Sequence, residues 1–216
     1  MMSTLSTAST GTLDPAFAQL ASDEQIEATV QALSAHGIQA VVVDTGEEAR
    51  DYVLSLLPEG AEVHQAASKT LGSIGLTAEV EESGRYKAIR PQLRRLDRRT
   101  QGREFRKLAS APDFMLGSVH AVTERGQVLI ASGSGGQIGP YASGAGTVIW
   151  VVGAQKLVRT LDDGLRRIEE YARPLEDERM RAATGWASQL NQILIVNGSL
   201  QPNRLKMVIV KENLGF

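Results

Sequence analysis

From about residue 22 onward, stretches with a helical spacing of apolar residues alternate with short, continuous apolar runs. A capping-box pattern at Ser22 and Gln25 begins the first predicted helix, and the apolar run IQAVVV after Gly37 predicts a buried strand. Thr45 and Glu48 begin a second unit of the same kind, which continues to the short predicted strand AEVH. Two helix-and-strand units in succession predict an α/β protein.

Further apolar runs later in the chain predict additional strands. They are TVIWVV at residues 147–152, ILIV at 193–196 and LKMVIV at 205–210, and a helix capped by Thr160 and Asp163 follows the first of them. A run without polar positions is typical of a strand that is covered on both faces. The predicted fold is therefore three-layer α/β, with a mainly parallel central sheet between helices. We expect one domain over residues 22–216, after a loosely ordered lead of residues 1–21.

A Gly/Ser loop over residues 132–146 separates the strand-like run VLIAS from TVIWVV. Glycine lets main-chain amides converge on an anion, and loops at the ends of parallel strands tend to line ligand crevices. The glycines do not match the dinucleotide fingerprint, and no Gly-Lys-Ser/Thr motif is present. The interpretation is an anion-binding loop; the alternative is a turn-forming crossover without a ligand. Its candidate binding residues are Ser132, Gly133, Ser134, Gly135, Gly136 and Gln137.

Four residues outside the loop are further candidates. Glu124 lies on a predicted tight turn, where its carboxylate could act as nucleophile or base or simply face water. Lys69 and Thr70 follow a strand and could meet a phosphate or carboxylate, or Ser68 or Thr70 could only cap a short helix. Lys156 follows the predicted central strand at its carboxyl end, where ligands collect in open sheets; the alternative is a surface lysine.

Composition narrows the function classes. The 216 residues carry a net charge of -2, which favours neither nucleic acid nor anionic lipid as a partner. The stretch 85–107 has a local net charge of +8, but it has few aromatic residues, so a solvated amphipathic helix is favoured over a nucleic-acid site.

The chain has no cysteine, its three histidines lack metal-ligand spacing, and we expect no metal site. His120 is interpreted as a core histidine. No segment is apolar enough to insert in a membrane, and the expected location is cytoplasmic.

Three segments carry a resemblance to a known family. They are SKTLGSIGL at residues 68–76, the segment from GSVHAVTERGQ to PLEDER at 117–179, and NGSLQPNRLKMVIVKENLGF at 197–216. The chain closely resembles the LutC/YkgG-type lactate-utilisation proteins, the LUD domain family. The resemblance implies a NagB/RpiA/CoA-transferase-like fold and a role in the oxidation of L-lactate to pyruvate beside iron–sulfur partner proteins. Without cysteine this chain holds no cluster, so the implied role is a non-redox ligand-binding or accessory component.

The wider superfamily implies a second function class, a stand-alone enzyme. Residues 123–126, Thr-Glu-Arg-Gly, look like the Ser-Glu-Asn-Gly stretch that carries the catalytic glutamate of family I CoA-transferases, with serine and asparagine replaced. Sugar-phosphate isomerases of this fold hold phosphate on glycine-rich loops. The candidate ligands are CoA, a nucleotide or a phosphorylated metabolite. The sequence leaves the oligomeric state and intrinsic catalysis open.

Overall fold

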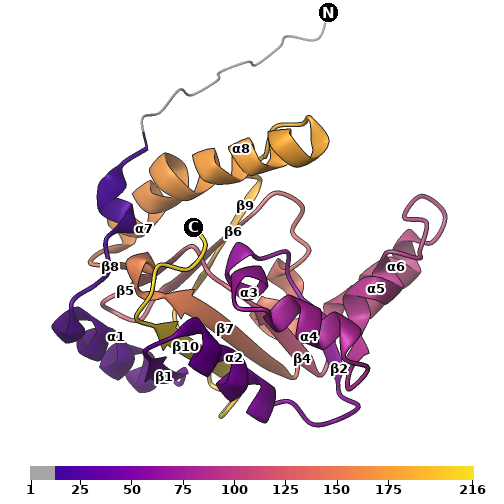
Figure 1. The fold of residues 1–216 in the computed structure, drawn as a ribbon, viewed down its shortest axis with the longest axis horizontal. Coiled ribbons are helices and arrows are strands. Elements are labelled where there is room, and N and C mark those ends of the chain that lie inside the picture. The colour runs from indigo at the N-terminus through magenta and orange to yellow at the C-terminus, as the bar shows by residue number, and fades with distance from the viewer. Residues whose placement is uncertain (1–12) are drawn as a thin grey trace, which may run out of the picture.

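A computed structural model describes residues 13–216. Its larger sheet has six strands in the order β1-β10-β7-β4-β2-β3, and every neighbouring pair is parallel. Helices flank this sheet (Figure 1), which confirms the predicted α/β fold with a mainly parallel central sheet. The strands are β1 (Gln39–Val43), β2 (Glu62–Gln65), β3 (Lys87–Ala88), β4 (Phe114–Gly117), β7 (Thr147–Gly153) and β10 (Leu205–Val210).

A second, four-stranded sheet has the order β8-β5-β6-β9. The strands are β5 (Ala121–Thr123), β6 (Val128–Ser132), β8 (Leu157–Val158) and β9 (Gln192–Val196). Strand β6 pairs antiparallel with both β5 and β9, whereas β5 and β8 are parallel. The run ILIV therefore belongs to this smaller sheet and not to the parallel one. Periodicity identifies a strand, but it does not identify the partner of that strand.

The helices begin where the capping patterns predict. Ser22 Oγ accepts from the amide of Gln25 at the start of α1 (Asp23–Ala35), and Thr45 Oγ1 accepts from that of Glu48 at the start of α2 (Gly46–Ser55). Helix α7 (Leu161–Arg167) begins with a complete capping box at Thr160. The remaining helices are α3 (Lys69–Ser73), α4 (Leu76–Glu82), α5 (Ile89–Leu93), α6 (Gly102–Ser110) and α8 (Arg173–Thr184).

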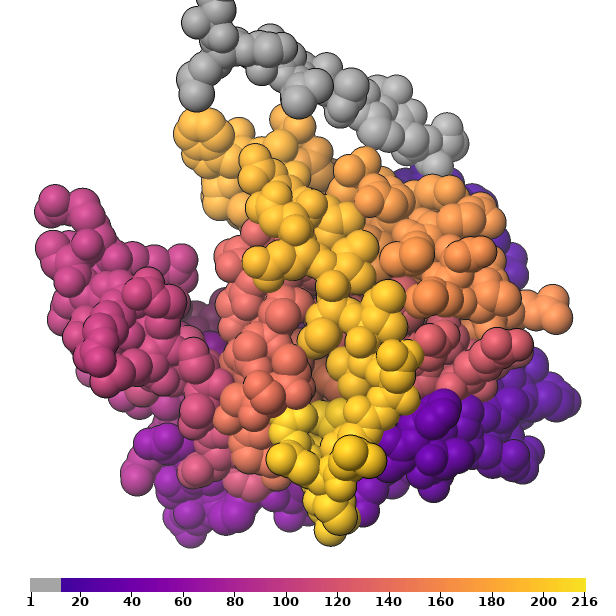
Figure 2. Space-filling model, turned by 180° about the vertical axis from the view of Figure 1, so that it is seen from behind, coloured from indigo at the N-terminus to yellow at the C-terminus, as the bar shows by residue number. Residues whose placement is uncertain are grey.

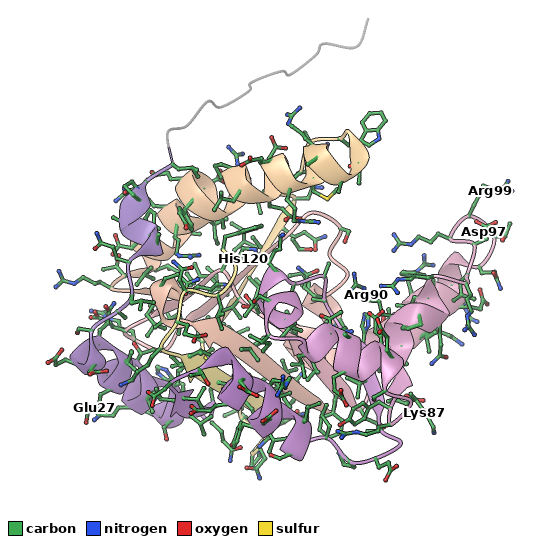
Figure 3. The ribbon with its side chains drawn as sticks, viewed as in Figure 1. Glu27, Lys87, Arg90, Asp97, Arg99 and His120 are labelled. Atoms are coloured by element: carbon green, nitrogen blue, oxygen red, sulfur yellow. The ribbon has the colours of Figure 1, made fainter. Side chains whose placement is uncertain are left out.

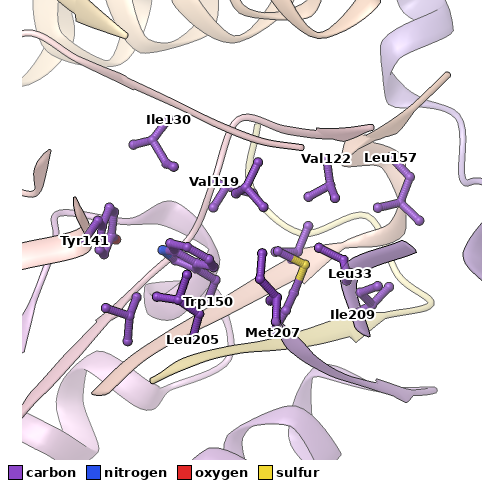
Figure 4. Packing of buried hydrophobic residues seen from close by; sticks show 14 of the residues in the cluster. Leu33, Val119, Val122, Ile130, Tyr141, Trp150, Leu157, Leu205, Met207 and Ile209 are labelled. Carbon is purple, nitrogen blue, oxygen red and sulfur yellow. The ribbon is translucent and has the colours of Figure 1, made fainter. Parts of the chain in front are cut away.

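The two faces of the parallel sheet bury different layers. On one face, α2, α3 and α4 pack against alternate positions of β4, β7 and β10, such as Leu116 and Ile149. On the other face, Trp150 and Met207 pack against α1 and against the second sheet, including Val122 and Ile130 (Figure 4). Residues from α7 and the π-helical turn Ile168–Ala172 cover the outer side of that second sheet. One continuous apolar layer thus joins the two sheets.

The lead expected over residues 1–21 falls mainly outside the described residues. Within the described part, Pro15–Ala18 form a 3-10 helix. The ring of Phe17 lies 6.4 Å from that of Tyr171, and the amide of Ala21 donates to the carbonyl of Ala154. These residues therefore contact the segments that carry the candidate site.

Candidate functional site

A cleft of about 1260 Å³ opens beside the carboxyl ends of the parallel strands β2, β4 and β7. Its lining includes residues 66–70 after β2, residues 118–120 after β4, and Lys156, which follows β7. The carboxyl ends of parallel strands meet at one edge of a sheet, so the three segments converge although they are far apart in the sequence. Helices α5 and α6, coloured magenta, stand away from the body beside a notch in the surface (Figure 2).

The amine of Lys156 lies at the floor of the cleft, and the residue is only 1% exposed. Its Nζ lies 3.0 Å from Thr70 Oγ1 and 3.1 Å from Ser118 Oγ. Thr70 Oγ1 donates its own proton to the carbonyl oxygen of Leu214, at 3.0 Å, and therefore accepts from the lysine. Among the described residues, no carboxylate forms an ion pair with this amine. The site therefore holds an amine whose partners are neutral.

Burial lowers the pKa of Lys156 well below its ordinary value, and the positive charge of Arg167 lowers it further. Arg167 is itself fully buried and donates to the main-chain carbonyls of Gln155, His120 and Phe17. Burial lowers the pKa of Arg167 to about 10, so its guanidinium stays charged at neutral pH. It ties the turn that carries Lys156 to the loop that carries His120.

His120 is half-buried and lines the same cleft (Figure 3). Its Nδ1 accepts a hydrogen bond from the amide of Ala131 at 3.1 Å, so the ring proton lies on Nε2. Burial first, then the charges of Lys156 and Arg167, lower the pKa of His120 to about 3. At neutral pH the imidazole is therefore an uncharged donor beside the lysine.

The first part of the Gly/Ser loop forms one wall of the cleft. Ser132 Oγ accepts from the amide of Gly135 at 2.8 Å and donates to Gln137 Oε1 at 3.1 Å. Gly135 has a φ of 76°, and a Cβ there would lie 2.5 Å from Gln192 Oε1. The amides of Gly133, Ser134 and Gly136 have no acceptor in the part of the chain that the structure describes. The loop reaches the cleft from β6 of the second sheet, not from the end of a parallel strand.

The α5–α6 arm, residues 89–110, forms a cationic wall. Arg90, Arg94 and Arg98 line the cleft, and the Arg98 guanidinium lies 4.2 Å from the centre of the Phe105 ring. Glu81 pairs with Arg94 at 2.8 Å and with Arg90 at 3.6 Å. On the opposite wall, Glu176 is paired with Arg179 at 2.6 Å. The acidic side chains near the cleft are thus paired, and cationic groups are in excess.

His64 and Gln65 end strand β2 and also line the cleft. Both are more than nine-tenths buried, and His64 Nδ1 and Gln65 Oε1 have no hydrogen-bond partner within the described chain. Burial, and then the charge of Arg90, lower the pKa of His64 to about 4. Such unpaired buried groups are costly to keep and are enriched at sites of function.

The structure brings most of the candidate residues together. Lys69, Thr70 and Lys156 line the same cleft as Ser132–Ser134 and Gly136–Gln137, and Gly135 lies behind them in the loop. Glu124 does not line it: its amide donates to the carbonyl of Val158 at the β5–β6 turn, at the other end of β6 from the loop.

Sequence reasoning missed Ser118, His64 and Gln65 and treated His120 only as a core residue. The signal that would have found Ser118 is its position directly after the apolar run FMLG, which is β4. His64 and Gln65 are polar residues that end an apolar run, but burial of their side chains cannot be read from the sequence.

Neither metal clusters nor membrane-spanning helices occur in residues 13–216. No group of three or more His, Asp or Glu side chains there is arranged to hold a metal ion. No helix in that range is both long enough and apolar enough to cross a bilayer.

Comparison with known proteins identifies one family. The family model described as LUD domain matches residues 26–210. The fold is similar to the crystal structure of a DUF162 family protein from Deinococcus radiodurans, with a TM-score of 0.51 and 13% sequence identity. That similarity covers 89% of this chain and 99% of the other. No curated protein matches the sequence.

Proposed function

The chain belongs to the LUD domain family, which is related to lactate utilisation, and we propose that its cleft binds an anionic metabolite as the non-redox component of a LutC-like system. In such a system L-lactate is oxidised to pyruvate. Because this chain has no cysteine, iron–sulfur partner proteins would carry the electrons. The protein's own part is to hold a ligand, and we place it in the cytoplasm.

The observation that carries this proposal is the buried amine of Lys156 inside a cleft with a cationic wall. Burial without a carboxylate partner disfavours the charged form of this amine, and a bound anion beside it would favour that form and pair with it. The free amides of Gly133, Ser134 and Gly136 add neutral donors that suit carboxylate or phosphate oxygens. Lys69 adds an exposed cation at the same edge.

The size of the cleft favours a ligand larger than lactate itself. Sites for drug-sized ligands have volumes of roughly 300–1,000 Å³, and this cleft has about 1260 Å³. CoA, a nucleotide or a phosphorylated metabolite would place its phosphates along Arg94 and Arg98 of the arm. The candidate ligands therefore range from a short carboxylate at the floor to a phosphate-bearing molecule that reaches the arm.

Thermal shift with L-lactate, pyruvate, inorganic phosphate, ATP and CoA tests the binding role. We expect at least one anion to raise the unfolding midpoint in proportion to its concentration. Lys156→Met should abolish the shift, and Lys107→Met, which changes an exposed lysine outside the cleft, should retain it. If no anion shifts the midpoint, or if Lys156→Met responds like the unchanged protein, the proposal is wrong.

A second pair of variants tests the loop. Gly135→Ala places a Cβ against Gln192 in a left-handed conformation, so the loop must move and anion binding should weaken. Gly60→Ala is the matched control, because Gly60 has the same φ of 76° and nothing within 4 Å of its Cβ position. Equal anion affinity in the two variants would remove the loop from the site.

The alternative is a stand-alone enzyme that performs acyl or CoA transfer through Glu124, or isomerises a phosphosugar held by the Ser132–Gly146 loop. Glu124 lies outside the cleft lining, which favours the binding role. Turnover by the isolated chain that disappears in Glu124→Gln would support the alternative. Stable copurification of a cysteine-rich iron–sulfur partner would support the accessory role.

A further inference from the structure

We propose that Ser118 and Lys156 form a nucleophile–base pair that accepts acyl groups from esters or thioesters bound in the cleft. Ser118 follows β4 directly, is half-buried and lines the cleft, and its Oγ lies 3.1 Å from Lys156 Nζ. An activated serine requires a base within hydrogen-bond reach and a third group that orients the base. The proposal goes beyond ligand binding and rests on the proposed function only for the place where the ligand binds.

Thr70 is the third group. Its hydroxyl proton is donated to the carbonyl of Leu214, so Thr70 Oγ1 can only accept from Lys156. This contact fixes one N–H of the amine at 3.0 Å and holds Nζ beside Ser118. Leu214 belongs to the C-terminal segment, which is anchored by Gln155 from the turn that carries the lysine. The amine is therefore held from two sides by the fold.

The surroundings favour the unprotonated amine, which is the form that can act as a base. No carboxylate pairs with Lys156 among the described residues, and the fixed charge of Arg167 opposes a second positive charge nearby. Serine–lysine pairs of this kind activate serine in some acyl-transfer enzymes. His120 Nε2–H and the amides of Gly133 and Gly136 line the same cleft and are available to the carbonyl oxygen of a substrate.

The reaction balances without a redox partner. Ser118 Oγ attacks the acyl carbon, an Oγ–C bond forms, and the hydroxyl proton passes to Lys156 Nζ. The bond from the acyl carbon to the leaving sulfur or oxygen then breaks, and Nζ returns the proton to the leaving thiolate or alkoxide. Water, or another acceptor hydroxyl or thiol, releases the acyl group from Ser118 by the same steps in reverse.

A fluorophosphonate probe and p-nitrophenyl acetate test the pair on the full chain. We expect the probe to label Ser118, as located by peptide mass mapping, and the ester to release p-nitrophenol in a burst. Ser118→Ala should lose labelling, and Lys156→Met should slow labelling on the order of 100-fold or more, which is typical for loss of a general base. Ser55→Ala and Lys107→Met, both outside the cleft, are the matched controls.

Anion binding separates this proposal from the binding role. Ser118→Ala should keep its circular dichroism spectrum, so that its loss of labelling cannot be assigned to unfolding. Binding by the unchanged protein without labelling of Ser118 would overturn the acyl-transfer pair and leave the binding role intact. Labelling of Lys156→Met at the rate of the unchanged protein would also overturn it, because the serine would then need no lysine. If the unchanged protein shows neither anion binding nor labelling of Ser118, both proposals are wrong.

Discussion

At the scale of single residues, we expect the buried Lys156 to serve ligand binding while it lowers the stability of the fold. Its amine is buried, has only neutral partners, and has a pKa held well below the ordinary value. Methionine has a similar length and no ionisable group that must lose its proton on burial. We predict that Lys156→Met raises the free energy of unfolding at neutral pH by about 1 kcal/mol, while it abolishes anion binding. Urea titration followed by circular dichroism measures the change, and a lower midpoint would contradict the prediction.

We predict that His64 makes the free energy of unfolding fall in acid. In the folded protein, burial and the charge of Arg90 lower the pKa of His64 from 6.5 to about 4. Between these two values the unfolded chain binds a proton that the folded chain does not bind. The contribution is fully present above pH 6.5 and is lost as pH falls from there toward about 4. His64→Asn should remove up to about 3 kcal/mol of this pH dependence.

Denaturant titrations at a series of pH values measure this effect. His36→Asn, which removes an exposed histidine, is the matched control and should keep the acid-side loss. His120 adds a loss of the same sign, so some pH dependence remains in the His64 variant. A His64→Asn slope equal to that of the unchanged protein would contradict the prediction.

The sequence could indicate candidate residues only through their places beside predicted strands. Lys156 and Thr70 each follow an apolar run, and the 3.0 Å contact between them joins positions far apart in the chain. Ser118 and His64 belong to the same cleft, but their roles depend on what surrounds them after folding. Glu124 sits on the predicted turn, yet only the three-dimensional arrangement separates that turn from the cleft.

At the scale of elements, the α5–α6 arm has two basic faces, and only one of them lines the cleft. Arg94 and Arg98 line the cleft, whereas their sequence neighbours Arg95 and Arg99 do not. Figure 3 shows Arg99 at the tip of the arm, next to Asp97. An apolar cluster that includes Ile89, Leu93 and Phe105 holds the two helices together.

We predict that replacing Arg94 and Arg98 by glutamine weakens CoA or ATP binding about 10-fold, as expected for the loss of charged hydrogen bonds. The matched variant, with Arg95 and Arg99 replaced by glutamine, should change affinity less than about 2-fold, since exposed charges contribute little. Isothermal titration at two salt concentrations measures both. Equal losses in the two variants would mean that the arm acts through its overall charge.

Elements that depend on local signals were predictable, and pairings that depend on tertiary contacts were not. The caps at Ser22, Thr45 and Thr160 and the strand β7 follow from short-range patterns. The second sheet does not, because β6 and β9 are separated by more than fifty residues and pair only after the chain has folded. Its presence explains how the Gly/Ser loop reaches the cleft from an antiparallel strand.

At the scale of the whole molecule, one apolar layer connects the two sheets that enclose the cleft. Ile130 of the second sheet and Trp150 of the parallel sheet belong to the same buried cluster, and both are fully buried. Sheets that share such a layer cannot separate without exposing it to water. The described part of the predicted domain should therefore unfold as one cooperative unit.

We predict that fluorescence and far-UV circular dichroism give coincident denaturant midpoints. Trp186 is 76% exposed, so a Trp186→Phe background isolates the signal of the buried Trp150. In that background Ile130→Ala should lower the free energy of unfolding by about 2–5 kcal/mol, and it should shift both midpoints equally although Ile130 and Trp150 belong to different sheets. If the fluorescence midpoint stays in place while the dichroism midpoint falls, the second sheet unfolds independently, and the cleft is then a boundary between two units that a ligand would have to hold together.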